Sequence, residues 1–422
     1  MKRIMAMILA GGRVDELKVL TLSRPKSTVP FGGMYRIIDF PLSNLMHAGI
    51  EKVGVLSQYH SASLVRHIGV GSSWDMVGRD RGMMVLPPFK SAVNSNWYRG
   101  TADAVYQNLD FIDQFAPDLV LILSGDHVYH MDYRELVDYH VRKGADLTAV
   151  FKEVPIEAAH RFGIATIDNE DGQVGGRLIA YHEKPQHPEA AWASLTIYLF
   201  NTNVLKQVLA QLMASQTNSY EFGHDILPAM VHSHKVYGFK FDGYWAYSRT
   251  IGEFWQANMD LLCEQPPINL HRWQVRTNLD HRNLRDRTPT VIAETAEVHN
   301  SVIYNGCHIA GRVTDSIIFP GVTVEAGASV SHSIVMFDTT IKRNCMIHKT
   351  ILDTDVVVSE NCQIGGGAQA DAIQPSDMEG VTVIGQATIL PTDMMIGSEC
   401  VISSYQKATQ FSSKIIPAGR VV

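Results

Sequence analysis

The sequence predicts an α/β domain with a Rossmann-like, mixed and mainly parallel sheet, followed by a left-handed β-helix. Two patterns carry this prediction. In the N-terminal part, short apolar runs alternate with amphipathic stretches, as buried strands alternate with helices in a sheet covered on both faces. Further along the chain, apolar residues recur at a fixed offset of 17 residues, which is typical of the stacked coils of a β-helix.

Short apolar runs at Ile4–Ala10, Lys52–Ser57 and Leu119–Leu123 predict buried strands of the first domain. The amphipathic stretches Pro41–Ala48 and Ala102–Phe115 lie between them and predict helices that cover the sheet. The first run follows two basic residues, as the apolar part of a signal peptide does. It is too short for that role and a glycine pair follows at once, so we expect a strand.

The segments after the first and third predicted strands are Gly11-Gly12-Arg13 and Ser124-Gly125-Asp126-His127. In open α/β sheets, ligands bind beyond the carboxyl ends of the strands. We therefore expect these two segments to face one crevice.

The two patterns are separated by residues 264–289. This segment has weak periodicity, two consecutive prolines and a charged run from His281 to Arg287, which together indicate a linker. The expected division is an α/β domain at residues 1–263, the linker, and the β-helix at residues 290–422.

The repeat of the C-terminal part consists of three apolar series. Within one coil, neighbouring anchors are about six residues apart with Gly or Asn between them, which is the imperfect hexapeptide signature of a β-helix. Each coil leaves apolar ends exposed, so the coils must stack. The series are Val313, Val330, Ile347 and Ile364; Val324, Ile341 and Val358; and Ile317, Ile334 and Ile351.

The net charge and composition of the chain limit the kinds of molecule that it is expected to bind. The net charge is -7 and 45% of the residues are hydrophobic, which argues against nucleic acid or an anionic membrane as the main partner. The five cysteines have no zinc-ligand or CxxC spacing, which favours a reducing, cytoplasmic setting. No apolar stretch reaches the length of a membrane span.

Several short motifs suit phosphate chemistry, although each has a simpler explanation. Gly11 and Gly12 after a strand let backbone N–H groups approach a polyphosphate, and a tight strand-to-helix turn explains them equally well. Arg24 and Lys26 suit phosphate contact, or form a solvated basic loop. Asp126 at a strand end can hold Mg²⁺, or cap a turn.

The motifs gain specificity because they occur together and in order. They are Leu9-Ala10-Gly11-Gly12-Arg13, Arg24-Pro25-Lys26, Tyr35 to Asn44 (YRIIDFPLSN), Gly100 to Val105 (GTADAV), Ser124-Gly125-Asp126-His127, Phe162-Gly163, Glu183-Lys184-Pro185 and Trp255-Gln256-Ala257-Asn258. This series closely resembles the bacterial glucose-1-phosphate adenylyltransferase (ADP-glucose pyrophosphorylase) family, over essentially the whole chain.

The resemblance implies an enzyme of glycogen synthesis that makes ADP-glucose and pyrophosphate from ATP and glucose 1-phosphate with Mg²⁺. It also implies a homotetramer controlled by a small-molecule effector bound between the domains, with Arg24 in the matching activator region. The departures described below add a hetero-oligomer with a catalytic paralogue as the alternative. The lysine usual before Arg24 is Ser23 here. The implied catalytic residues are Lys26, Asp126 (the metal ligand) and Lys184; the nucleotide-binding residues are Gly11, Gly12, Tyr98, Gly100 and Asp103; and the sugar-phosphate residues are Gly163, Glu183, Lys184 and Ser194.

The sequence departs from the family pattern at two places. The family loop GGxGxRL has a glycine where Val14 stands here, and its arginine corresponds to Glu16. The family motif YWRDVGTI has an aspartate, the second metal ligand, where Tyr247 stands here. Asp242 is a nearby substitute for that carboxylate. Arg249 is also unusual, and we hypothesise that it pairs with Glu16.

These departures leave alternatives to an active adenylyltransferase. One is a regulatory subunit without turnover of its own, which would need a catalytic paralogue. Another is a transferase for a different sugar phosphate or nucleotide. Acyl transfer by histidines of the β-helix has little support, because histidines at coil corners are commonly surface residues.

Overall fold

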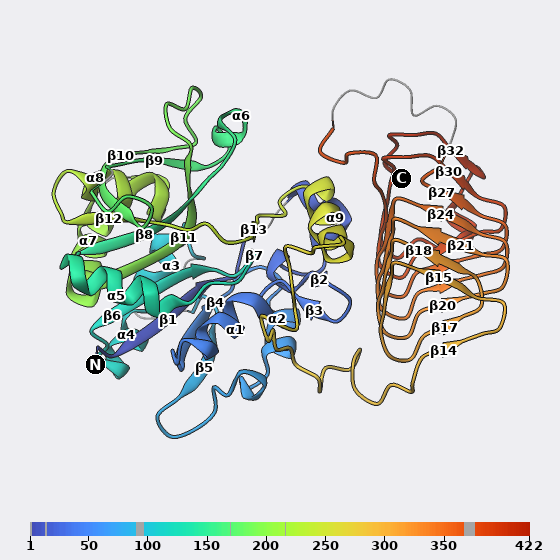
Figure 1. Ribbon diagram of the computed structural model, residues 1–422, viewed down its shortest axis with the longest axis horizontal. Helices are drawn as coiled ribbons and strands as arrows, with labels where there is room; N and C mark the ends of the chain where they lie inside the picture. Colours follow the sequence, from blue (N-terminus) through green and yellow to red (C-terminus); the bar gives the residue numbers. More distant parts are fainter. Residues whose placement is uncertain (1, 13–14, 90–96, 169, 216, 367–375) are drawn as a thin grey trace. The chain divides into compact units, whose positions relative to one another are not determined.

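The computed structural model describes residues 2–12, 15–89, 97–168, 170–215, 217–366 and 376–422 (Figure 1). The chain forms two compact units. The first contains residues Met1–Gly12, Phe40–Ser61 and Ile68–Trp245, and the second contains Arg13–Asp39, Ala62–His67 and Ala246–Val422. Among the described residues, no helix is long and apolar enough to cross a membrane.

The first unit is built on one mixed sheet with the strand order β5-β4-β1-β6-β11-β8-β12-β10-β9. Parallel pairs join β5 to β4, β4 to β1, β1 to β6 and β8 to β12, whereas antiparallel pairs join the remaining neighbours. The strands are β1 (Ile4–Leu9), β4 (Lys52–Leu56), β5 (Gly82–Leu86), β6 (Leu119–Ser124), β8 (Leu147–Glu153), β9 (Gly163–Ile167), β10 (Gly175–Glu183), β11 (Trp192–Asn201) and β12 (Val236–Lys240).

The three strands predicted from apolar runs are confirmed as β1, β4 and β6. They are adjacent parallel strands, and most of their side chains are buried, because helices cover the sheet and leave no polar face. The helices of this unit include α1 (Asp39–His47), α3 (Thr101–Tyr106), α4 (Leu109–Phe115), α5 (Tyr133–Lys143), α7 (Thr202–Ala214) and α8 (Leu227–Val231).

The helix expected over 102–115 is divided into α3 and α4 at Asn108. The Asn108 side chain donates to the Ala104 carbonyl, 2.8 Å away. In a continuous helix, the backbone N–H of Asn108 would donate to this same carbonyl. The Asn108 amide instead donates to Val105, at 3.1 Å. The side chain therefore competes with the helical hydrogen bond and ends the helix there.

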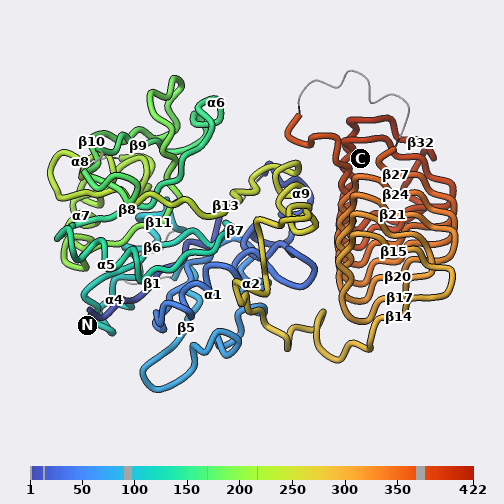
Figure 2. The backbone as a smooth tube through the Cα atoms, in the orientation of Figure 1, coloured from blue at the N-terminus to red at the C-terminus, as the bar shows by residue number. Residues whose placement is uncertain are grey.

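The C-terminal part of the second unit is a left-handed β-helix whose coils stack from β14 (Val291–Ile292) to β32 (Ile415–Ile416) (Figures 1 and 2). Three parallel sheets form its sides, and the 17-residue series are confirmed as partners in adjacent coils, as in Val313↔Val330. The other strands are β15 (Glu297–His299), β16 (Val302–Ile303), β17 (His308–Ile309), β18 (Arg312–Thr314), β19 (Ile317–Ile318), β20 (Thr323–Val324), β21 (Ser329–Ser331), β22 (Ile334–Val335), β23 (Thr340–Ile341), β24 (Met346–His348), β25 (Thr350–Leu352), β26 (Val357–Val358), β27 (Gln363–Ile364), β28 (Thr382–Ile384), β29 (Ile389–Leu390), β30 (Met395–Ile396) and β31 (Val401–Ile402).

Residues 264–289 form turns and carry no regular helix or strand. They nevertheless contribute buried side chains such as Ile268 and Trp273 to the second unit. Arg287 ion-pairs with Asp338 of the β-helix at 2.6 Å. Parts of this segment therefore pack against the rest of its own unit, whereas many of its other residues are exposed.

The second unit also contains helical elements that come before the β-helix in the chain. Two 3-10 turns, separated by a kink at Lys18, span Asp15–Thr21. Helix α9 (Ile251–Met259) has Thr250 as its N-cap, which forms a capping box with Glu253. Glu16 lies in the first of these elements, and Arg249 directly precedes the N-cap of α9.

Candidate active site

Two chain segments meet at one edge of the sheet in the first unit, as the strand pattern predicted. Leu9 of β1 pairs with Ser124 of β6, so the residues that follow each strand emerge together. The Gly125 amide donates to the Leu9 carbonyl, 2.9 Å away. A Cβ atom on Gly11 would lie 2.8 Å from the Gln58 amide nitrogen, so only glycine fits this turn.

A cavity of about 210 Å³ opens next to this turn. Gly11, Gly12, Tyr98 and Gly100, four of the predicted nucleotide-binding residues, line it. Its other lining residues are Leu9, Leu56, Gln58, Arg99, Thr101, Ala104 and Glu221. The combination of a glycine turn, an aromatic ring and a few polar groups is typical of a pocket for a planar ligand.

Asp103 is the predicted nucleotide-binding residue that does not line this cavity. Its buried carboxylate accepts from the Arg99 backbone amide at 2.9 Å and from the Arg99 guanidinium at 2.7 Å. Burial raises the pKa of Asp103, but the hydrogen bonds from Arg99 and Gln107 lower it on balance, so it is a carboxylate. Asp103 thus holds Arg99, which does line the cavity.

Two polar residues of the cavity have no recognisable signal in the sequence. The Gln58 side chain accepts from the Tyr98 amide at 2.8 Å and donates to the Tyr98 carbonyl at 3.2 Å. Glu221 accepts from the hydroxyl and the amide of Thr101. Burial raises the pKa of Glu221. Both residues are distant in sequence from the groups they hold, so spacing alone could not identify them.

Asp126 lies at the same sheet edge as Gly11. Its Oδ1 accepts from the Ser124 hydroxyl and lies 3.4 Å from Nε2 of His127. Among the described residues, no three His, Cys, Asp or Glu side chains form a cluster that could hold a metal ion. A single carboxylate fits Mg²⁺, which commonly takes its other ligands from substrate phosphates and water.

The predicted sugar-phosphate residues are close together at strands β9, β10 and β11. Glu183 pairs with Gly163 across the β10–β9 ladder, and the Lys184 amide donates to Phe162 at 3.0 Å. Glu183 accepts from the Tyr181 hydroxyl at 2.9 Å, and Ser194 lies 3.1 Å from the Tyr198 hydroxyl. A carboxylate beside hydroxyl groups, with a lysine next in the chain, can bind a phosphorylated sugar.

Lys26 belongs to the second unit and is buried, with 1% of the residue exposed. Its ammonium group donates to the Tyr247 carbonyl at 2.5 Å and lies 4.6 Å from the centre of the Tyr247 ring. The residue at the position of the family's second metal ligand therefore holds Lys26 through its carbonyl and ring.

Glu16 and Arg249 form the ion pair that the sequence suggested. Arg249 donates from Nε to Oε1 of Glu16 at 2.8 Å, and its Nη2 lies 2.7 Å from the same oxygen. Burial raises the pKa of Glu16, but a backbone hydrogen bond and Arg249 lower it on balance. Val14, the other departure in the glycine loop, lies outside the described residues, as does Arg13.

Two further residues named from the sequence make other contacts. Asp242, the suggested substitute metal ligand, is exposed and lines a separate groove with His130 and Asp132. Arg24, expected near an effector, is buried and ion-paired with Asp353.

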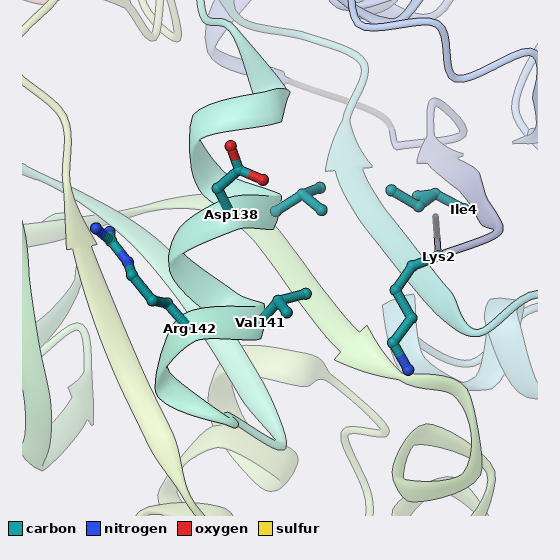
Figure 3. Close-up of a pocket in the computed structure, with 6 residues that line it drawn as sticks. Lys2, Ile4, Asp138, Val141 and Arg142 are labelled. Atoms are coloured by element: carbon teal, nitrogen blue, oxygen red, sulfur yellow. The ribbon is translucent and has the colours of Figure 1, made fainter.

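A further groove lies at the opposite end of strand β1 from the glycine turn. Figure 3 shows Lys2 and Ile4 at the start of β1, with Asp138, Val141 and Arg142 on α5. None of the predicted site residues lines it. The chemistry is therefore expected at the carboxyl edge of the sheet.

Comparison with known proteins identifies the class. The nucleotidyl transferase family model matches residues 5–264, and the model for a GlmU-like C-terminal hexapeptide domain matches residues 290–384. The fold and the site thus define a nucleotidyl transferase with a C-terminal hexapeptide β-helix.

Curated relatives identify the family within this class of protein. The glucose-1-phosphate adenylyltransferase of Thermotoga neapolitana is 46% identical and aligns over 100% of this chain and 99% of its own length. That of Fervidobacterium nodosum is 39% identical over 100% and 98%. That of Bacillus thuringiensis is 43% identical over 78% of this chain and 86% of its own. The chain belongs to the glucose-1-phosphate adenylyltransferase family.

Proposed function

We propose that the chain transfers the adenylyl group of ATP to glucose 1-phosphate. A phosphate oxygen of the sugar phosphate attacks the α-phosphorus of ATP, the bond to the β-phosphate oxygen breaks, and ADP-glucose and pyrophosphate form. The observation that carries this proposal is that one sheet edge supplies both a glycine-lined cavity and a separate carboxylate–lysine corner. The relatives' shared name agrees with it.

In this scheme the residues act mainly by positioning and charge. Gly11, Gly12 and Tyr98 would hold the nucleotide, with Arg99 fixed by Asp103. Glu183 would accept from sugar hydroxyls, and Lys184 would pair with the sugar phosphate.

The phosphate groups require cations. Asp126 would hold Mg²⁺, which neutralises phosphate charge when bound. Lys26, held by Tyr247, would contact a phosphate oxygen. In-line phosphoryl chemistry depends on such positioned cations rather than on a nucleophile from the protein.

We also propose a cytoplasmic oligomer, either a homotetramer or a hetero-oligomer with a catalytic paralogue, that responds to a small-molecule effector. The guanidinium of Arg24 already contacts Asp353. An effector anion that used Arg24 would therefore have to compete with that carboxylate.

A pyrophosphate-release assay on the full chain tests the function. Release is expected only when ATP, glucose 1-phosphate and Mg²⁺ are all present. No release with any nucleoside triphosphate or sugar phosphate would contradict the proposal. Comparison with a Glu16→Arg, Tyr247→Asp, Arg249→Gly variant distinguishes the alternatives, because activity in the variant alone would indicate a regulatory subunit. Arg249 must change with Glu16, since two arginines would otherwise face each other.

Replacing Gly100 by Ala is expected to weaken ATP binding by about tenfold. A Cβ atom at Gly100 would lie 2.3 Å from the Tyr220 carbonyl oxygen and 2.4 Å from that of Ser219, so this segment and the adjacent Glu221 must shift. Calorimetric titration with ATP measures the effect. Gly82→Ala is the matched control, because nothing lies within 4 Å of its added Cβ atom. Equal affinity in Gly100→Ala and the wild type would show that this segment does not shape the nucleotide site.

A further inference from the structure

The guanidinium of Arg249 is held in a fixed orientation. Glu16 contacts one edge of it, through Nε and Nη2, while Nη1 donates to the Tyr247 hydroxyl at 3.3 Å. The Arg249 and Thr250 amides both donate to the Glu253 carboxylate, at 2.9 and 3.1 Å, which fixes the backbone just before α9. An arginine restrained at both its side chain and its backbone loses little further freedom when it binds a ligand.

This arginine also retains unused N–H donors. A guanidinium carries five N–H groups. The contacts of Arg249 with the residues that the structure describes use one N–H on each of its three nitrogens. One N–H group on Nη1 and one on Nη2 therefore take no part in these contacts, and 32% of the side chain is exposed. Donors on two neighbouring nitrogens of one guanidinium can bind oxygens of a phosphate group.

A second cation lies close to Arg249. Tyr247, which Arg249 contacts through its hydroxyl, also holds the ammonium group of Lys26 through its carbonyl and ring. Two cations are thereby arranged around one residue. Glu16, which orients the guanidinium, follows the Gly11-Gly12 turn by only four residues in the chain.

We propose that Arg249 binds the phosphate chain of the nucleoside triphosphate, and that Glu16 is the positioning residue that orients it. This inference rests on the proposed function, because it assigns a new ligand-binding residue to the same reaction. The positive charge absent from position 16 is then supplied from position 249. Glu16 accordingly acts as the acceptor that fixes the relocated arginine.

Calorimetric titration of the full chain with adenosine, ADP and ATP tests the proposal. Arg249→Gln is expected to weaken ATP binding by about 10- to 100-fold, because two charge-assisted hydrogen bonds are lost. Adenosine binding is expected to change by less than about twofold, because adenosine carries no phosphate. Arg249→Lys keeps the charge without the planar fork and should fall between the two.

Arg312→Gln is the matched control. Arg312 also pairs with a glutamate of the second unit, Glu297 at 2.7 Å, on an exposed face of the β-helix. This control should bind all three ligands as the wild type does.

Unchanged ATP affinity in Arg249→Gln would overturn the inference alone. A proportional loss for adenosine and ATP would also overturn it, since that result indicates a general structural role. If Arg249→Gln does not fold, Arg249→Lys decides the question by the same ratio of ATP to adenosine affinity. A wild-type chain that binds no ATP would overturn the proposed function together with this inference.

Discussion

Asp126→Asn is expected to reduce the rate of pyrophosphate release about 1,000-fold. The substitution keeps the shape of the side chain and removes its negative charge, which is what would hold Mg²⁺ against the phosphates. The Ser124 hydroxyl can still donate to the amide oxygen, so the turn after β6 should retain its structure. The loss is expected in kcat at saturating substrate, with little change in the affinity for adenosine.

The control for this prediction is Asp132→Asn. Asp132 lies six residues further along, caps α5 by accepting from the Arg134 amide at 2.9 Å, and lies in a separate groove. Asparagine also caps helices well, so activity should remain within about twofold of the wild type. Steady-state assays over a range of Mg²⁺ concentrations measure both variants. If Asp126→Asn retained activity within about tenfold, the metal would have to be held by other groups.

The repeating part of the fold could be predicted from the sequence in detail. Each coil of the β-helix repeats the same local sequence pattern. The spacing between Val313 and Val330 therefore predicts that these residues are paired in adjacent strands. The strands β1, β4 and β6 were predictable for a similar reason, since their burial on both faces produces continuous apolar runs. The break at Asn108 was not predictable, because it depends on a side chain competing for one carbonyl.

The candidate site was predictable where it consists of local motifs. Gly11, Gly12, Tyr98 and Gly100 line one cavity, as the motifs suggested. Asp103 does not line this cavity, because its carboxylate is bonded to Arg99 at the start of helix α3.

Contacts between distant segments were predictable only where both residues were unusual for their positions in the sequence. Glu16 and Arg249 were both unusual charges, so their pairing could be hypothesised. Glu221 has an ordinary sequence context, and only the fold places it beside Thr101.

The burial of Arg24 was the least predictable feature, since it requires the β-helix as a partner. Its guanidinium donates to Asp353 at 2.5 Å and to the Leu20 carbonyl at 2.9 Å. Only 8% of the Arg24 side chain and 1% of the Asp353 side chain are exposed. The sequence suggested a solvated basic loop as one explanation of Arg24, whereas the structure shows an internal ion pair.

Arg24→Met is therefore expected to lower the free energy of unfolding by about 3–5 kcal/mol. The substitution keeps an apolar side chain of useful length but leaves the Asp353 carboxylate buried without its guanidinium partner. Its hydrogen bond from the Thr354 amide, at 2.7 Å, compensates only part of that charge. Urea unfolding followed by circular dichroism measures the loss.

A second substitution separates the cost of the unpaired charge from the loss of packing. Adding Asp353→Asn to Arg24→Met removes the buried charge and should restore more than half of the lost stability, because breaking a buried pair costs more than replacing both members. The matched control is Arg312→Met, which breaks an exposed pair with Glu297 and should cost no more than about 1 kcal/mol. A double variant no more stable than Arg24→Met would mean that Arg24 stabilises the unit by packing and by its bond to Leu20. Recovery would instead assign the cost to the buried carboxylate, and an effector that draws Arg24 away from Asp353 would then have to overcome that same cost.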